Sequence, residues 1–114
     1  MPNQKYLVFL RSVPGNQPKH DPEQMQQMHA AFKNWAEKYS NNIVDMGGRL
    51  KPGGKILTPS GVTDGPFAEA KEVVGGFMIV AAENYERAVE IARECPGVVR
   101  PGASVEVREI ASPG

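Results

Sequence analysis

The sequence predicts an α+β fold, in which one antiparallel sheet is covered on one face by two helices. Three observations support this class: apolar strand-like segments near both ends of the chain, two segments with helical spacing of apolar residues, and short glycine- and proline-rich connections between them. The chain has 114 residues, of which 40% are hydrophobic. We therefore expect a single domain over residues 1–114, with a folded core of about 5–110.

The first element is predicted to be a strand over residues 5–11, because five consecutive apolar or aromatic residues are flanked by charges there. Pro14-Gly15 then indicates a turn, and the loop that follows ends at Asp21. Asp21 fits a helix N-cap, Pro22 fits the first helical position, and Gln24 fits the return partner of a capping box. A helix is therefore expected to begin here.

This first helix is predicted to run for four to five turns and to end near residues 40–42. Its polar residues occupy one side, which is typical of a helix that lies on a sheet with its back to water. The residues expected on the inward face are Met25, Met28, His29, Phe32, Trp35, Ala36 and Tyr39.

The region from residue 43 to 63 is predicted to hold two short strands, at 43–46 and 56–58, interrupted by turns. A stronger strand is expected over 73–82, with Gly75-Gly76 marking a bulge or a close backbone approach. Asn84 then caps a second helix, which Pro96-Gly97 ends. The last strand is expected over 104–110.

The order strand, helix, strand, strand, helix, strand predicts a ferredoxin-like βαββαβ antiparallel sheet with two helices on one face. The strand segments 6–10 and 77–80 are nevertheless apolar on both sides of the pleat, whereas a strand with one face in water should alternate. We expect a second copy of the chain to cover the other face, which predicts a homodimer. The alternative is a monomer, because small sheets tolerate some exposed apolar residues.

Two residues are candidates for catalysis, His29 and Asp64. His29 is expected to point inward from the first helix, either as a packed core residue or as an acid–base group near neutral pKa. Asp64 precedes Gly65-Pro66, where its carboxylate either folds back onto backbone N–H groups in a structural turn or accepts a proton at the mouth of a cleft between helix and sheet. A hydrogen bond from His29 to Asp64 or Glu69 would favour the catalytic alternative.

The connection that follows Asp64 concentrates an aromatic and several charged side chains just ahead of a buried strand. Phe67, Glu69 and Lys71 are the candidate ligand-binding residues there. The alternative is a solvated face, in which an exposed charge pair contributes little free energy.

Several classes of function are excluded or disfavoured by composition. Thirteen basic and thirteen acidic residues balance without forming a run, which argues against nucleic acid and membrane surfaces as partners. The apolar run at 6–10 is too short for a signal peptide or a membrane span, so we expect a cytoplasmic protein. No phosphate-binding, dinucleotide or metal-ligand spacing is present, so no cofactor or metal is expected. The single Cys95 is expected to be a core residue.

The tetrapeptide Asp64-Gly65-Pro66-Phe67, with residues 68–72 and Gly75-Gly76-Phe77 after it, resembles the signature of the YCII-related proteins, also called the DGPF-domain family. Similar features are Met25, His29 and Trp35 in the first helix, Cys95-Pro96, and residues 105–108. The resemblance implies a ferredoxin-like protomer in a dimeric α/β-barrel. It also implies little about activity: members are mostly uncharacterised, a His and Asp pair has been proposed as an active site in some, and others are encoded beside sigma factors. Residues 47–60 depart most from the family pattern.

Two hypotheses from different classes therefore remain open. The first is a cofactor-independent enzyme that acts by acid–base chemistry on a small polar organic molecule, with His29 as the acid or base and Asp64 as its orienting partner. The second is a non-catalytic small-molecule-binding or regulatory accessory module. A pocket that contains both side chains favours the enzyme, and a filled cleft favours the module.

Overall fold

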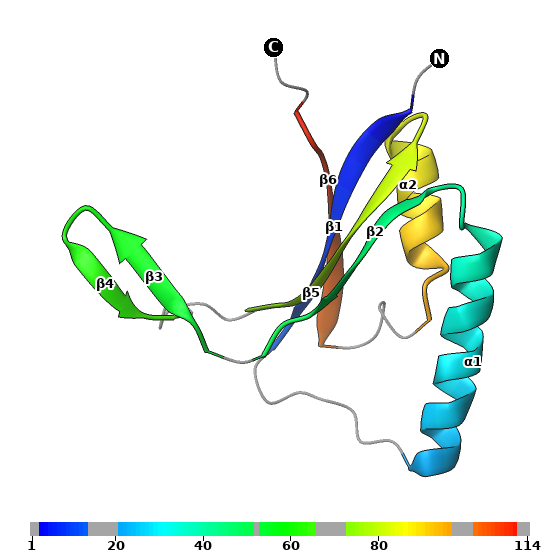
Figure 1. Ribbon diagram of the computed structural model, residues 1–114, viewed down its shortest axis with the longest axis horizontal. Helices are drawn as coiled ribbons and strands as arrows, with labels where there is room; N and C mark the ends of the chain where they lie inside the picture. The colour runs from blue at the N-terminus through cyan, green and yellow to red at the C-terminus, as the bar shows by residue number, and fades with distance from the viewer. Residues whose placement is uncertain (1–2, 14–20, 52, 66–72, 97–101, 112–114) are drawn as a thin grey trace.

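The computed structural model describes residues 3–13, 21–51, 53–65, 73–96 and 102–111 (Figure 1). The predicted class is confirmed, because two helices and a mainly antiparallel set of strands make up the fold. The elements in chain order are β1 (Gln4–Ser12), α1 (Pro22–Lys38), β2 (Ile43–Arg49), β3 (Lys55–Thr58), β4 (Gly61–Asp64), β5 (Val73–Ala82), α2 (Tyr85–Arg93) and β6 (Ala103–Glu109).

The main sheet has four strands in the order β2-β5-β1-β6, and all neighbours are antiparallel. This order places the first and third strands of the βαββαβ unit in the centre, as the ferredoxin-like arrangement requires. Both helices lie on the same side of the sheet (Figure 1). The ferredoxin-like prediction is therefore confirmed for the protomer.

The segment 56–58 does not join this sheet, although the sequence predicts a strand there. It lies in β3, which pairs with β4 in a separate two-stranded sheet inserted between β2 and β5. The turn at Pro59-Ser60 reverses the chain directly after β3, so its backbone groups pair with the strand that follows. The resulting β3–β4 hairpin projects from the side of the main sheet opposite to the helices (Figure 1).

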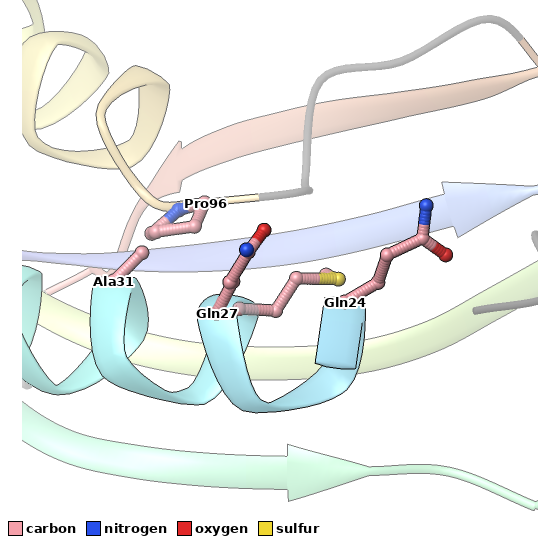
Figure 2. Close-up of a pocket in the computed structure, with 5 residues that line it drawn as sticks. Gln24, Gln27, Ala31 and Pro96 are labelled. Atoms are coloured by element: carbon pink, nitrogen blue, oxygen red, sulfur yellow. The ribbon is translucent and has the colours of Figure 1, made fainter. Parts of the chain in front are cut away.

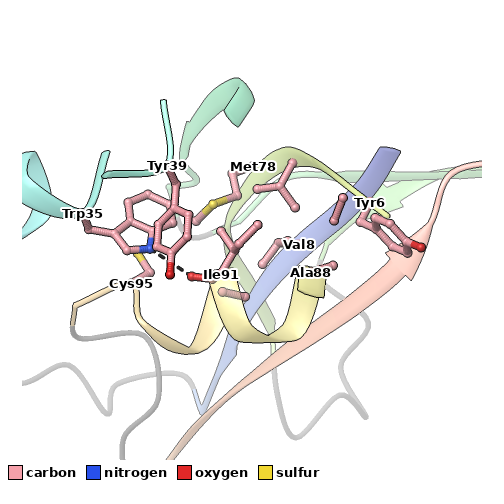
Figure 3. Packing of buried hydrophobic residues seen from close by; sticks show 11 residues of the cluster. Tyr6, Val8, Trp35, Tyr39, Met78, Ala88, Ile91 and Cys95 are labelled. Carbon is pink, nitrogen blue, oxygen red and sulfur yellow. Dashed lines mark hydrogen bonds between the residues drawn. The ribbon is translucent and has the colours of Figure 1, made fainter. Parts of the chain in front are cut away.

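The core lies between the helices and the inward face of the sheet (Figure 3). Alternate residues of the central strands point into it, and aromatic and aliphatic side chains of both helices meet them there. No buried polar side chain lacks a hydrogen-bond partner among the described residues. The buried set is Tyr6, Val8, Trp35, Tyr39, Met78, Val80, Ala82, Ala88, Ile91, Ala92 and Cys95.

Both helix starts match the predicted caps. The Asp21 carboxylate accepts a hydrogen bond from the Gln24 N–H at 2.7 Å, and the Gln24 carboxamide accepts one from the Asp21 N–H at 3.1 Å. The Asn84 side chain accepts from the Arg87 N–H at 2.9 Å. These bonds satisfy N–H groups that have no partner within the helix, which fixes where each helix begins.

The predicted irregularity at Gly75-Gly76 is a bulge. The register between β1 and β5 shifts there, because Leu10 pairs with Gly76 whereas the next residue, Arg11, pairs with Val74. Gly76 also allows a close approach of β2, since a Cβ at this position would lie 3.3 Å from the Gly48 carbonyl oxygen. A glycine is therefore favoured where the three strands converge.

Candidate functional site

Helix α1 is attached to the core by its C-terminal half. The Trp35 Nε1–H donates a hydrogen bond to the Ile91 carbonyl oxygen at 2.9 Å, which ties α1 to α2. Tyr39 is buried, and Lys38 pairs with Glu94 at 2.9 Å. The first turns of α1 extend past the end of the sheet (Figure 1). Residues on that part of the helix therefore have no sheet beneath them.

This placement corrects the prediction that His29 points inward. His29 is exposed, and its neighbours on the predicted inward face are also open to solvent, with Met25 50% and Phe32 38% exposed. The apolar spacing identifies the correct helix, but within Pro22–Lys38 only Trp35 is buried. His29 is thus a solvent-accessible imidazole on the protomer surface.

Asp64 is the last residue of β4, and its side chain is 87% exposed. Its carboxylate forms an ion pair with the Lys55 ammonium group across the β3–β4 hairpin. The expectation that it lies at the mouth of a cleft between helix and sheet is wrong in the protomer, because the hairpin and α1 lie on opposite sides of the sheet (Figure 1). The protomer does not bring Asp64 and His29 together.

The other three predicted site residues, Phe67, Glu69 and Lys71, lie outside the described residues. The same holds for Pro66, so the structure describes only Asp64 and Gly65 of the tetrapeptide. Gly65 donates its N–H to the Gly54 carbonyl oxygen at 2.8 Å, which closes the base of the hairpin.

A surface hollow of about 300 Å³ lies between the N-terminal half of α1 and the end of α2. It is lined by Gln24, Gln27, Met28, Ala31 and Pro96. The side chain of Gln27 extends from α1 toward the segment that carries Pro96, whereas that of Gln24 leaves the start of the helix farther from Pro96 (Figure 2). Two carboxamides thus line the hollow together with apolar groups, and none of the described lining residues is ionisable. Sequence reasoning missed this hollow, since glutamines on an exposed helix surface carry no signal of their own.

The sheet face that the helices leave uncovered is apolar at its centre. Leu7 pairs with Ile79 and Phe9 with Phe77 across β1 and β5, and all four side chains are half-buried. Charged residues surround them on the neighbouring strands, with Arg108 beside Leu7, Glu106 beside Phe9 and Asp45 beside Ile79. Arg11 forms a 2.9 Å ion pair with Glu106. An apolar centre with a charged rim is typical of a protein–protein interface.

A smaller hollow of about 170 Å³ opens on the β1–β6 side of this face, lined by Leu7, Phe9, Arg108, Glu109 and Ile110. Its position makes it part of the uncovered sheet surface.

Among the described residues, two core side chains have a shifted pKa. Burial raises the pKa of the Cys95 thiol to about 11, so the thiol stays protonated near neutral pH. Burial also raises the pKa of the Tyr6 hydroxyl, and the Glu109 carboxylate at 3.4 Å raises it further. The prediction that Cys95 is a core residue is confirmed, because it is 4% exposed.

Among the described residues, no group of three His, Cys, Asp or Glu side chains is placed to hold a metal ion. No helix in the described part of the chain is long and apolar enough to span a membrane.

A comparison with protein families identifies the chain. The model of the YCII-related domain matches residues 5–112, which is nearly the whole length. The chain belongs to the YCII-related family. No curated protein matches it. Membership supports the resemblance drawn from the residues around Asp64 and agrees with the ferredoxin-like protomer, and the function has to be argued from the surfaces described above.

Proposed function

We propose that this YCII-related protein is a homodimeric binding module that takes a small, polar, uncharged organic molecule without catalysing a reaction. The observation that carries this proposal is the hollow beside α1, which is lined, among the residues that the structure describes, by two carboxamides and apolar groups and by no ionisable side chain. A volume of about 300 Å³ suits a small ligand. Carboxamides donate and accept hydrogen bonds, but they do not exchange protons near neutral pH.

The dimer rests on the uncovered sheet face and on the amount of exposed surface. The chain exposes 8548 Å², whereas a compact monomer of its mass exposes roughly 6,100 Å². Its radius of gyration is 15.9 Å, compared with about 13 Å for a compact domain of this length. Packing the apolar centre formed by Leu7, Phe9, Phe77 and Ile79 against its two-fold copy removes part of this surplus from water.

Sedimentation velocity at micromolar concentration tests the dimer. We expect a species of twice the 12.4 kDa chain mass. Phe9→Glu places a charge at the centre of the uncovered face and should give a monomer. Met25→Glu, on the half-exposed part of α1, is the matched control and should leave the dimer intact. A wild-type species at 12.4 kDa would refute the assembly.

Binding is tested by protein-observed NMR with a library of small amides, alcohols, carboxylates and phenols. We expect the compound that binds to shift the side-chain amide signals of Gln24 and Gln27. Gln27→Leu should weaken its affinity at least about tenfold, which corresponds to one hydrogen bond of about 1.4 kcal/mol. Gln26→Leu, on an exposed position outside the hollow, should have no effect. Shifts that gather at His29 and Asp64 instead, or a library with no binder, would refute the module.

The second candidate is the acid–base enzyme with His29 and Asp64. The observation in its favour is that Asp64 sits on a hairpin that projects from the uncovered side of the sheet, where the proposed partner would lie (Figure 1). The catalytic pair would then have to form between Asp64 of one protomer and His29 of the other. This candidate predicts that Asp64→Asn changes the NMR chemical shifts of the His29 ring in the dimer; unchanged chemical shifts would exclude it.

A further inference from the structure

We infer that the β3–β4 hairpin is an arm that packs against a second copy of this chain through the face formed by Leu57 and Val62. The inference rests on the homodimer proposed above and adds a second contact surface to it. The arm is defined as residues 55–58 and 61–64.

The exposed face of the arm carries an apolar pair, Leu57 and Val62, next to the ion pair of Lys55 and Asp64. Leu57 and Val62 are directly opposite each other in the register, and they are 75% and 62% exposed. These two side chains are the most exposed of the large hydrophobic residues in the described part of the chain. On the other face, Ile56 pairs with Thr63 and is half-buried close to Gly65. Among the arm residues only Ile56 is thus half-buried, and Leu57 and Val62 stay exposed to solvent.

A hairpin of this kind needs a surface to lie on. An isolated two-stranded hairpin is marginally stable in water, and a third strand or another packing surface is needed to hold it. The arm forms a sheet of its own and is not hydrogen-bonded to the β2-β5-β1-β6 sheet among the described residues. Both side chains of the Lys55–Asp64 ion pair are exposed to solvent, so the pair adds little to the stability of the arm.

The position of the arm identifies the occupant. The arm projects on the same side of the main sheet as the uncovered face (Figure 1). A second copy seated on that face lies beside the arm, and the two-fold axis places its own arm beside the first protomer. The protomer exposes about 2,400 Å² more surface than a compact monomer of the same mass. This excess is larger than the roughly 800 Å² that each partner buries in a standard interface.

The charges of the arm also favour a copy of this chain over a charged partner. Lys55 and Asp64 compensate each other, and the chain as a whole has a formal net charge of zero. A nucleic acid or an anionic membrane would select an uncompensated basic surface, which the arm lacks.

The experiment measures the dissociation constant of the dimer for Leu57→Ser/Val62→Ser by sedimentation over a range of concentrations. We expect it to rise at least about 100-fold, equivalent to about 2.7 kcal/mol, because each dimer contains two such arms. Thr63→Ser, on the opposite face of the arm, is the matched control and should leave the constant unchanged. Hydrogen exchange of the arm amides should be slower in the dimer than in the monomeric Phe9→Glu variant.

The outcomes separate this inference from the proposed dimer. A wild-type protein that sediments as a monomer overturns the dimer and the arm contact together. A wild-type dimer whose dissociation constant is unchanged by Leu57→Ser/Val62→Ser overturns only the arm contact. Equal exchange rates of the arm amides in wild type and Phe9→Glu would also overturn the arm contact, since a packed arm has to be protected by the partner.

Discussion

Replacing Gly47 by alanine tests the irregular pairing of β2 with β5. Gly47 has a φ of +63° and lies where the register shifts between Asp45 and Gly48. Its N–H donates to the Asp45 carboxylate at 2.8 Å, which holds the local turn of the strand. A Cβ at this position would overlap the Phe77 carbonyl oxygen and lie 2.6 Å from the carbonyl carbon. Both the backbone conformation and the available space therefore require glycine.

The expected loss of stability has two parts. An L-residue with a side chain costs roughly 1–2 kcal/mol in the left-handed region. Relieving the overlap requires β2 to move away from Phe77, which weakens one or two backbone hydrogen bonds at about 1 kcal/mol each. Gly47→Ala should thus lower the free energy of unfolding by about 3 kcal/mol.

Gly48→Ala is a control one residue away. A Cβ at Gly48 meets no heavy atom within 4 Å, and its φ lies outside the positive region. The change should alter stability by less than about 0.5 kcal/mol. Urea unfolding followed by the fluorescence of buried Trp35, at one fixed protomer concentration, measures both variants. Equal stabilities of the two variants would refute the explanation.

Three further predictions concern the helices and the core. Trp35→Phe removes the hydrogen bond to the Ile91 carbonyl and leaves that buried acceptor unpaired, so calorimetry should show a loss of about 2 kcal/mol; an unchanged melting temperature would contradict this. Asn84→Ala removes the cap on the Arg87 N–H and should cost about 1 kcal/mol by urea unfolding, whereas Asn84→Asp should retain most of the stability. The folded thiol of Cys95 has a pKa of about 11, so the unfolded chain loses this proton at a lower pH, and the free energy of unfolding should fall as pH rises from 9 toward 11. Cys95→Ala should lose this part of the pH dependence. The same slope of unfolding free energy against pH in both proteins would contradict this explanation.

The elements that the sequence predicts well are those fixed by local interactions. Asp21 and Asn84 satisfy helix N–H groups three residues along the chain, so a short stretch of sequence is sufficient to place both helix starts. The strand predicted over 73–82 has the same bounds in the structure, because a continuous apolar run between polar segments is typical of a buried central strand.

The predictions that were wrong or incomplete concern the tertiary packing partner of an element. The spacing of apolar residues in α1 predicts which side faces inward, but whether that side is covered depends on tertiary packing, and within α1 only Trp35 is buried. The sequence therefore places His29 and Met25 in the interior although both are exposed. The prediction of a strand at 56–58 is correct, but its partner depends on the turn after it, and that turn forms a separate hairpin.

The placement of Asp64 on this hairpin changes how the family tetrapeptide should be interpreted. A residue on an arm, paired with Lys55 and exposed on its own protomer, acquires a defined environment only from whatever the arm packs against. Under the homodimer proposal, that environment is supplied by the second copy, so the chemistry available to Asp64 is a property of the assembly. The residues that line the hollow beside α1, in contrast, already lie together within one protomer. Binding at that hollow should therefore persist in the monomeric Phe9→Glu variant, whereas any role of Asp64 should require the dimer.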